Sequence, residues 1–260
     1  MPVEQGFPEN ERTIIQDPVQ IPDDPPKPNR AALSSAWFDS PDTGLADHTD
    51  SLAVQRARAL VDSARETANE LREGLVTKNP YATNGQHLEH WERQANQRLK
   101  NINTRFADKL AHSIQEERER VSDTLNAEAQ IGETPRAGEI RGHFRSLSKQ
   151  DRNELYHQMM AEGDPETVSA LTSAPGYLSG LTEKQKANLL YAYKKRVAPQ
   201  YVARLEALDK AEEVALNAAA GLEGYVDEIK QATRIHNANR RAEAAQNVWS
   251  SDEETEGDAA

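Results

Sequence analysis

Apolar residues recur at heptad spacing along much of this chain. Between Val54 and Leu75 they alternate in steps of three and four residues, the pattern of a helix that packs lengthwise against another helix. The turn residues Asn84 and Gly85 follow a break in this pattern. Over residues 86–130 the steps are three, four and four, which predicts a second long helix with a nearly straight contact line.

A third pattern predicts a long helix over residues 182–248. Thr182 can cap its first turn, and Pro199 should kink or interrupt it. The seams are rich in alanine and bury little area, so we expect self-association to supply stability that a single chain lacks. The residues expected to form this self-association seam are Val54, Val61, Leu71, Leu75, Leu99, Phe106, Leu205, Leu208, Leu222 and Val226.

Residues 135–181 carry a different pattern, in which short apolar stretches are separated by helix caps and stops. Ser148 and Asp164 are N-cap residues, Gly163 is a stop, and Pro165 suits a first helical position. This punctuation predicts a helical corner and requires no ligand site. The expected core of this small head is Phe144, Leu147, Leu155, Met159, Val168, Leu171, Tyr177, Leu178 and Leu181, closed by Leu189 and Leu190.

The two ends of the chain look different from its middle. Eight of the 13 prolines lie within the first 41 residues, which predicts an extended, solvated arm over residues 1–48. Leu33, Trp37 and Phe38 stand out in this arm as partner-docking residues. Two interpretations stay open: they form a short turn packed on the chain's own body, or they dock in a partner's groove. Under the second, removing residues 1–48 should leave the helices intact.

Composition fits this organisation. Hydrophobic residues make up 37% of the chain and aromatic residues 5%, a thin supply for a globular core but sufficient for narrow helical seams. We therefore expect an all-α fold, an elongated helical hairpin or coiled-coil bundle with a small helical head and disordered termini. The expected segments are the arm 1–48, a long-helix region 49–134, the head 135–181, a returning helix 182–248 kinked near Pro199, and a disordered acidic tail 249–260.

Charge argues against nucleic-acid binding. The net charge is −12, and the excess acids lie at the ends, leaving 28 acids and 27 bases between residues 49 and 240. No basic face is in surplus there, so we do not expect nucleic acid as a partner. The most basic stretch, Lys194 to Arg196, is followed by acids and is interpreted as a solvated helix face. With Arg240 and Arg241 it supports the alternative of a DNA-packaging or nucleic-acid-binding regulator.

Catalytic chemistry has little support in the sequence. His87 and His90 lie one turn apart but lack a third metal ligand, and we interpret them as polar residues at an exposed helix start. Glu154 and His157 have the spacing of a di-iron motif, but no second Glu-x-x-His occurs. The chain has no cysteine. We therefore assign no catalytic, cofactor-binding or metal-binding residues and no cofactor, and expect a protein that is not an enzyme, with neither a secretory signal nor a membrane-spanning segment.

One stretch resembles a known group of proteins. "GEIRGHFRSLSKQDRNELYHQMMAEGDPETVSALTSAPGYLSGLTEKQKANLLYAY", residues 138–193, is similar to a small helical module in poorly characterised proteins of tailed bacteriophages and prophages. It covers about a quarter of the chain, and its landmarks are structural. The resemblance implies a bacteriophage structural or assembly protein of scaffolding or minor virion type, located in the virion or host cytoplasm. Its expected partners are itself, as a homo-oligomer, and other virion or capsid proteins. A secreted effector that binds host proteins remains a further alternative.

Overall fold

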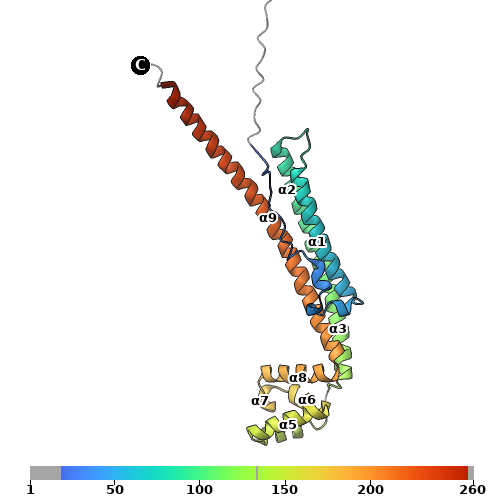
Figure 1. Cartoon of the computed structure of the whole chain (residues 1–260). Coiled ribbons are helices and arrows are strands. Elements are labelled where there is room, and N and C mark those ends of the chain that lie inside the picture. Colours follow the sequence, from blue (N-terminus) through green and yellow to red (C-terminus); the bar gives the residue numbers. More distant parts are fainter. Residues whose placement is uncertain (1–18, 133, 257–260) are drawn as a thin grey trace, which may run out of the picture. The chain divides into compact units, whose positions relative to one another are not determined.

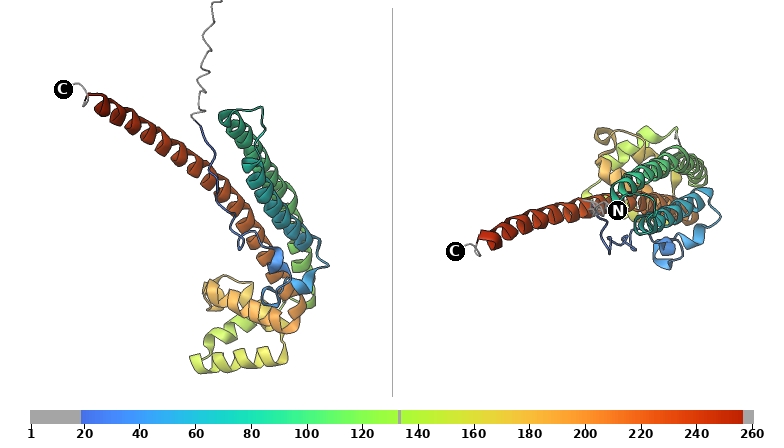
Figure 2. Two further views of the ribbon diagram at one scale, coloured as in Figure 1. Left: turned by 45° about the horizontal axis from the view of Figure 1, so that its top comes forward. Right: turned by 90° about the horizontal axis from the view of Figure 1, so that it is seen from above.

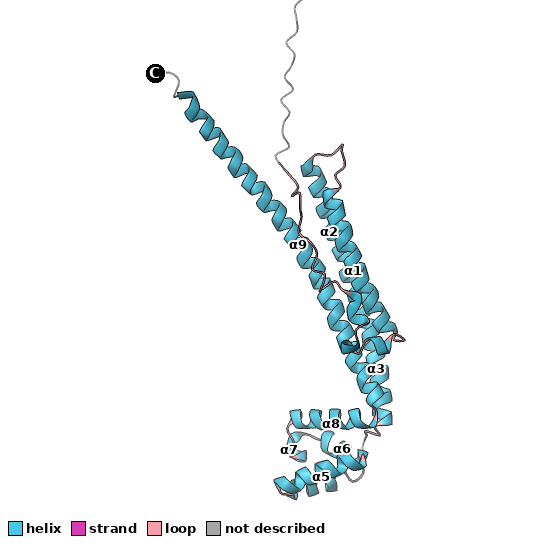
Figure 3. Cartoon of the chain, viewed as in Figure 1, coloured by secondary structure: helices cyan, strands magenta, loops and turns pink. Residues whose placement is uncertain are grey.

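Every regular element of the described chain is a helix. The computed structural model describes residues 19–132 and 134–256, and in these ranges it contains helices, turns and loops without a strand (Figures 1 and 3). The all-α class expected from the sequence is confirmed. Side chains are described except at residues 105–107, 235, 240, 241 and 243–256.

The long helices are α1 (Leu52–Val76), α2 (Asn84–Arg105), α3 (Ala111–Glu128) and α9 (Pro199–Glu256). A π-helical segment, η4 (Phe106–Leu110), joins α2 to α3. The shorter helices are α4 (Ala137–Ser146), α5 (Lys149–Glu162), α6 (Pro165–Thr172), α7 (Gly176–Ser179) and α8 (Glu183–Val197). Three-residue and four-residue 3-10 helices precede α1: η1 (Ser35–Phe38), η2 (Pro41–Thr43) and η3 (Ala46–His48).

The chain divides into two compact units. The first contains the described residues of 1–30, 65–101 and 220–260, and the second contains residues 31–64 and 102–219. In the first unit, α2 runs antiparallel to the end of α1, because Trp91 contacts Leu71 while His87 contacts Leu75. Residues of α9 complete its core. The buried side chains of this unit include Leu71, Leu75, Trp91, Ala95, Leu222, Tyr225, Val226 and Ile229.

The helical body of the second unit is built from the beginnings of α1 and α9 and from α3. Leu125 of α3 clusters with Val202 of α9, whereas Arg118 reaches Asp209, so these two helices also run antiparallel. The buried side chains of this body include Val54, Ala57, Val61, Ile114, Val121, Leu125, Val202 and Leu208.

Most of the residues expected to form a self-association seam are packed inside the single chain, and self-association through them stays a prediction. The chain's own helices supply the partner that the heptad pattern requires. Val54, Val61, Leu71, Leu75, Leu208, Leu222 and Val226 are each at most 3% exposed. Leu99 and Leu205 are half-buried, and the side chain of Phe106 lies outside the described residues.

The π-helical segment explains how one helical line stays apolar from α2 to α3. Apolar residues follow one another in steps of four from Ile102 to Ile114. In an α-helix each such step drifts about 40° around the axis, because a turn takes about 3.6 residues. The wider turn of η4 takes up this drift. Ile102, Leu110 and Ile114 are accordingly all buried.

The head is a cluster of short helices around one core. Phe144, Met159, Val168, Leu171 and Tyr193 are buried together, and α6 lies between α5 and α8 (Figure 1). Three residues expected in this core are not in it. Leu147 is half-buried outside the cluster, and the side chains of Tyr177 and Leu178 on α7 are 78% and 36% exposed. The helix α7 spans a single turn and directs both side chains outward.

The expected returning helix is interrupted rather than kinked. The helix α8 ends at Val197. The backbone of its C-cap, Ala198, leaves the helical region at φ −141° and ψ 60°, and α9 starts anew at Pro199. Proline lacks the amide hydrogen that would continue α8. The head therefore extends to Val197, because Leu189 and Tyr193 of α8 belong to its core.

Parts of both terminal segments have regular structure. Residues 31–48 contain the 3-10 helices η1, η2 and η3 joined by turns, and Leu33, Phe38 and Leu45 are at most 2% exposed. The burial of Leu33 and Phe38 agrees with the packed-turn interpretation of these two residues. The acidic tail, expected to be disordered from residue 249, is helical to Glu256, since α9 continues through glutamates that favour helix. Residues 1–18 and 257–260 lie outside the described chain.

Candidate functional site

The strongest candidate for a binding site is a groove of the first unit that holds the segment of residues 19–30, called the arm below. Asn237 of α9 makes two hydrogen bonds to the main chain of Gln20. Its carboxamide oxygen accepts from the Gln20 amide at 2.7 Å, and its nitrogen donates to the Gln20 carbonyl at 3.1 Å. The arm runs along α9 at this point (Figure 2).

A second asparagine holds the neighbouring residue from the other side. The carboxamide nitrogen of Asn84, in the first turn of α2, donates to the carbonyl of Val19 at 2.7 Å. Three hydrogen bonds thus fix two consecutive residues of extended main chain between α2 and α9. Because they all involve main-chain atoms, they impose a backbone conformation without selecting a side chain.

The arm groove also has room for a side chain. A cavity of about 290 Å³ lies beside Val19 and is lined by Leu88 and Trp91 of α2 and by Thr233 and Asn237 of α9. Further along the arm, Pro25 is buried, and Asp24 lies 3.5 Å from the guanidinium of Arg72. The Asp24 side chain is 78% exposed, so this ion pair adds little to the free energy of binding the arm.

Sequence reasoning missed this groove. The sequence pattern identifies Asn84 only as a turn residue, and nothing around Asn237 distinguishes it from other polar residues of a helix. The only usable signal is indirect: an extended segment rich in proline must satisfy its main-chain groups outside itself, and asparagine offers both a donor and an acceptor.

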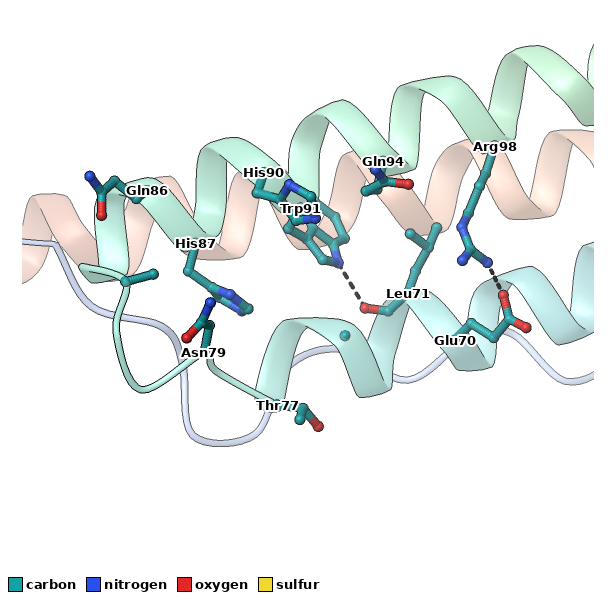
Figure 4. Close-up of a pocket in the computed structure, with 12 residues that line it drawn as sticks. Glu70, Leu71, Thr77, Asn79, Gln86, His87, His90, Trp91, Gln94 and Arg98 are labelled. Carbon is teal, nitrogen blue, oxygen red and sulfur yellow. Dashed lines mark hydrogen bonds and ion pairs between the residues drawn. The ribbon is translucent and has the colours of Figure 1, made fainter.

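A larger cavity of about 400 Å³ lies where α1 ends and α2 begins (Figure 4). His87, His90 and Trp91 of α2 line it together with Leu71 and Glu70 of α1. Figure 4 shows His87 and Trp91 projecting from α2 toward the end of α1.

The polar atoms of this cavity serve the helix end. The indole nitrogen of Trp91 donates to the Leu71 carbonyl at 2.7 Å, and Nε2 of His87 lies 3.0 Å from the Leu75 carbonyl. Leu75 is in the last turn of α1, where carbonyls lack a partner within the helix, so His87 caps α1. His87 is buried, which corrects its interpretation as an exposed residue, whereas His90 is exposed.

The second unit contains a buried carboxylate, Glu117, whose side chain is 6% exposed. Its Oε2 accepts from the hydroxyl of Ser51 at 2.8 Å, and Oε1 accepts from the guanidinium of Arg204 at 2.7 Å. Arg204 also reaches Asp50 at 2.8 Å. Burial raises the pKa of Glu117, but hydrogen bonds from Arg204 and Ser51 outweigh burial and hold that pKa below its usual value. This network ties α3 to the starts of α1 and α9.

The head has its own cavity, of about 330 Å³. The buried side chains Phe144 and Met159 line it beside Lys149 and Arg152. Arg152 is committed to the structure, because its guanidinium donates to the carbonyls of Phe144, Leu147 and Arg145 and so caps the end of α4. Arg152 also stacks on the ring of Phe144.

The basic stretch of α8 is locally neutralised. Lys195 donates to the hydroxyl of Tyr191 at 3.0 Å and pairs with the carboxylate of Glu206 at 3.3 Å. Burial lowers the pKa of the half-buried Lys194. Arg196 donates to the carbonyl of Ala161. Lys195 and Arg196 are exposed, as expected of a solvated helix face, whereas Lys194 is half-buried. The side chains of Arg240 and Arg241 lie outside the described residues.

Of the three expected docking residues, Trp37 alone has an accessible side chain, 45% exposed. Its indole nitrogen donates to the carbonyl of Ala31 at 3.3 Å. It lines a cavity of about 410 Å³ together with Lys210, Val214 and Asn217 of α9. Trp37 therefore marks a small surface site of the second unit. Leu33 and Phe38 are buried and do not line this site.

In the described residues, no group of three or more histidine, aspartate or glutamate side chains is placed to hold a metal ion. No helix in that part of the chain has the length and apolar character needed to cross a membrane. Comparison with protein-family models, curated proteins and solved structures finds no match to this chain.

Proposed function

We propose that this chain is a non-enzymatic structural or assembly component of a bacteriophage particle, of scaffolding or minor virion type. Its work is to contact other virion or capsid proteins, in the virion or in the host cytoplasm during assembly. The proposal is supported by the resemblance of residues 138–193 to a helical module of phage proteins and by the way the head presents its surface.

The observation that carries the proposal is the exposed pair Tyr177 and Leu178 on α7. The turn that presents them is sterically defined. A Cβ at Gly176 would lie 2.6 Å from the carbonyl oxygen of Leu181, and Gly180 has φ +73°, a left-handed conformation that favours glycine. An exposed aromatic residue on a defined turn is typical of a protein-binding anchor.

The cavities of the molecule support a binding role in another way. Their polar side chains hold helix ends, as His87 does for α1 and Arg152 for α4. A catalytic site instead places such groups where a substrate can reach them.

The test is mass spectrometry of purified procapsids and virions from the phage or prophage that encodes the chain. We expect the protein in one or both. Tyr177→Ala with Leu178→Ala should reduce its incorporation several-fold, as expected when one buried aromatic anchor is lost. Tyr81→Ala is the matched control, since Tyr81 is 96% exposed in the turn between α1 and α2.

Absence of the protein from both particles would reject a structural role. Equal incorporation of the head variant and of Tyr81→Ala would reject α7 as the contact. Neighbouring genes separate this proposal from a host-directed effector, because capsid and portal genes beside it are expected only for an assembly component.

A further inference from the structure

We propose that the arm groove between α2 and α9 binds the arm of a second copy of this chain in place of its own, so that copies associate by arm exchange. This inference does not depend on a phage origin. It supplies a route to self-association after the heptad seams have been assigned to the interior of one chain.

The first step is that the groove recognises main chain. Asn237 binds both the amide and the carbonyl of Gln20, and Asn84 binds the carbonyl of Val19. A second copy's arm carries the same sequence and can make the same three hydrogen bonds. The contact energies of the two arrangements are therefore equal, and only the connection to the body distinguishes them.

The second step is that this connection suits exchange. Residues 26–30 link the buried Pro25 to the next segment and include Pro26 and Pro28. Lys27 and Arg30 in this linker are exposed. Proline favours an extended chain of roughly 3.1 Å per residue, so these five residues span roughly 15 Å. An arm can leave its groove at this linker without unfolding a helix.

The third step concerns concentration. A short linker holds an arm near its own groove at an effective concentration on the order of millimolar. Arms therefore stay in their own grooves in dilute solution. Exchange becomes substantial when copies are concentrated to a similar level, as on the surface of a growing assembly.

The chain has no cysteine, so any disulfide must form between cysteines introduced at chosen positions. Val19 and Ala238 line the same cavity. We would mix full-length Val19→Cys with full-length Ala238→Cys, oxidise, and measure the mixed disulfide dimer by non-reducing electrophoresis. We expect it to rise with protein concentration up to the millimolar range. The double variant Val19→Cys/Ala238→Cys in one chain should form an internal disulfide in dilute solution.

Two further variants test for chance collisions and for the role of Asn237. Replacing Ala238→Cys by Tyr81→Cys offers an exposed thiol away from the groove, and should give little mixed dimer. Adding Asn237→Ala to the Val19→Cys/Ala238→Cys double variant removes two of the hydrogen bonds that hold the arm, and should slow formation of its internal disulfide roughly tenfold.

The proposal is overturned if, at millimolar protein, the Ala238→Cys mixture gives no more mixed dimer than the Tyr81→Cys mixture. It is also overturned if the double variant forms no internal disulfide, because the arm then does not occupy the groove. An internal disulfide that forms equally fast with and without Asn237→Ala would reject the asparagine contact as what holds the arm in the groove.

Discussion

At the residue scale, Glu117 combines two roles that are usually separate. Its carboxylate accepts from the Ala53 amide at 3.4 Å and from Ser51, next to the start of α1, where free amides favour a negative charge. The same carboxylate pairs with Arg204 of α9. A buried charge that lost this partner would be costly, so Glu117 and Arg204 are coupled.

Glu117→Gln should therefore lower the free energy of unfolding by about 1.5–3 kcal/mol, the range for a hydrogen bond to a charged group. The amide still accepts from Ser51 but no longer offers Arg204 a negative charge. Urea denaturation measures the change. The matched control is Glu116→Gln at the preceding position. The Glu116 carboxylate is 64% exposed and pairs with His112, so this substitution should change stability by less than about 0.5 kcal/mol. Equal effects of the two substitutions would contradict this role for Glu117.

The same pair predicts a dependence on pH. The pKa of Glu117 is held below its usual value in the folded state, so its stabilisation is complete above the unfolded pKa of about 4.3 and is lost as pH falls through the folded pKa. The pKa of Asp50 is likewise lowered, chiefly by a hydrogen bond from Arg204. The stability difference between wild type and Glu117→Gln should be constant from pH 7 to about pH 5 and shrink below about pH 4. A difference that persists at low pH would contradict the assignment.

Single residues were the hardest part of the site to predict from the sequence. Asn237 and Asn84 bind main chain that lies far from them in sequence, and no local pattern records such a pairing. His87 was misjudged for a related reason, because its burial depends on α1 ending beside it. The sequence shows that Leu33 and Phe38 are apolar, but it does not show whether the surface that buries them belongs to the same chain.

At the element scale, the head is held by local capping. Asp164 accepts from the amides of Glu166 and Thr167 at 3.0 and 3.1 Å, Pro165 occupies the first position of α6, and Thr182 forms a capping box with Gln185. These contacts involve residues two or three positions apart. That is why the caps and stops at Ser148, Gly163, Asp164 and Thr182 could be predicted from the sequence.

Asp164→Ala should destabilise α6 by about 1 kcal/mol, because two amides of its first turn lose their acceptor. Hydrogen exchange of the peptide that spans α6 should become faster. Asp164→Asn retains a side-chain oxygen at the same place and should exchange almost as slowly as the wild type. If the asparagine variant exchanges as fast as the alanine variant, the capping hydrogen bonds are not what holds α6.

Other elements could be predicted only in part. The break at Pro199 was expected. That α8 belongs to the head could not be predicted, because it depends on the packing of Leu189 and Tyr193 against residues of α5 and α6. The π-helical segment corresponds to a run of apolar residues in steps of four. The same run is compatible with an uninterrupted α-helix, so the sequence alone does not predict the segment. The ordering of residues 31–48 depends on contacts with α1, such as the ion pair between Asp39 and Arg58.

At the scale of the whole molecule, the central question is whether heptad seams join copies or fold one chain. The heptad pattern cannot decide, because a helix needs an apolar partner from either source. In this chain the seams are covered from within: Leu208 and Leu222 of α9 are fully buried in a single copy. Self-association by arm exchange leaves Leu208 and Leu222 buried within their own chain.

Leu222→Ala should therefore lower the free energy of unfolding by about 2–5 kcal/mol, the cost of a cavity in a packed core. Because the partner residues belong to the same chain, the loss should be the same at all protein concentrations; a seam between copies would instead make the melting temperature rise with concentration. The matched control is Leu216→Ala on the same helix, where the leucine is 46% exposed and the loss should stay below about 1 kcal/mol. Thermal unfolding of both variants over a hundredfold range of protein concentration separates the two interpretations. A loss for Leu222→Ala that depends on concentration would show that the seam lies between copies.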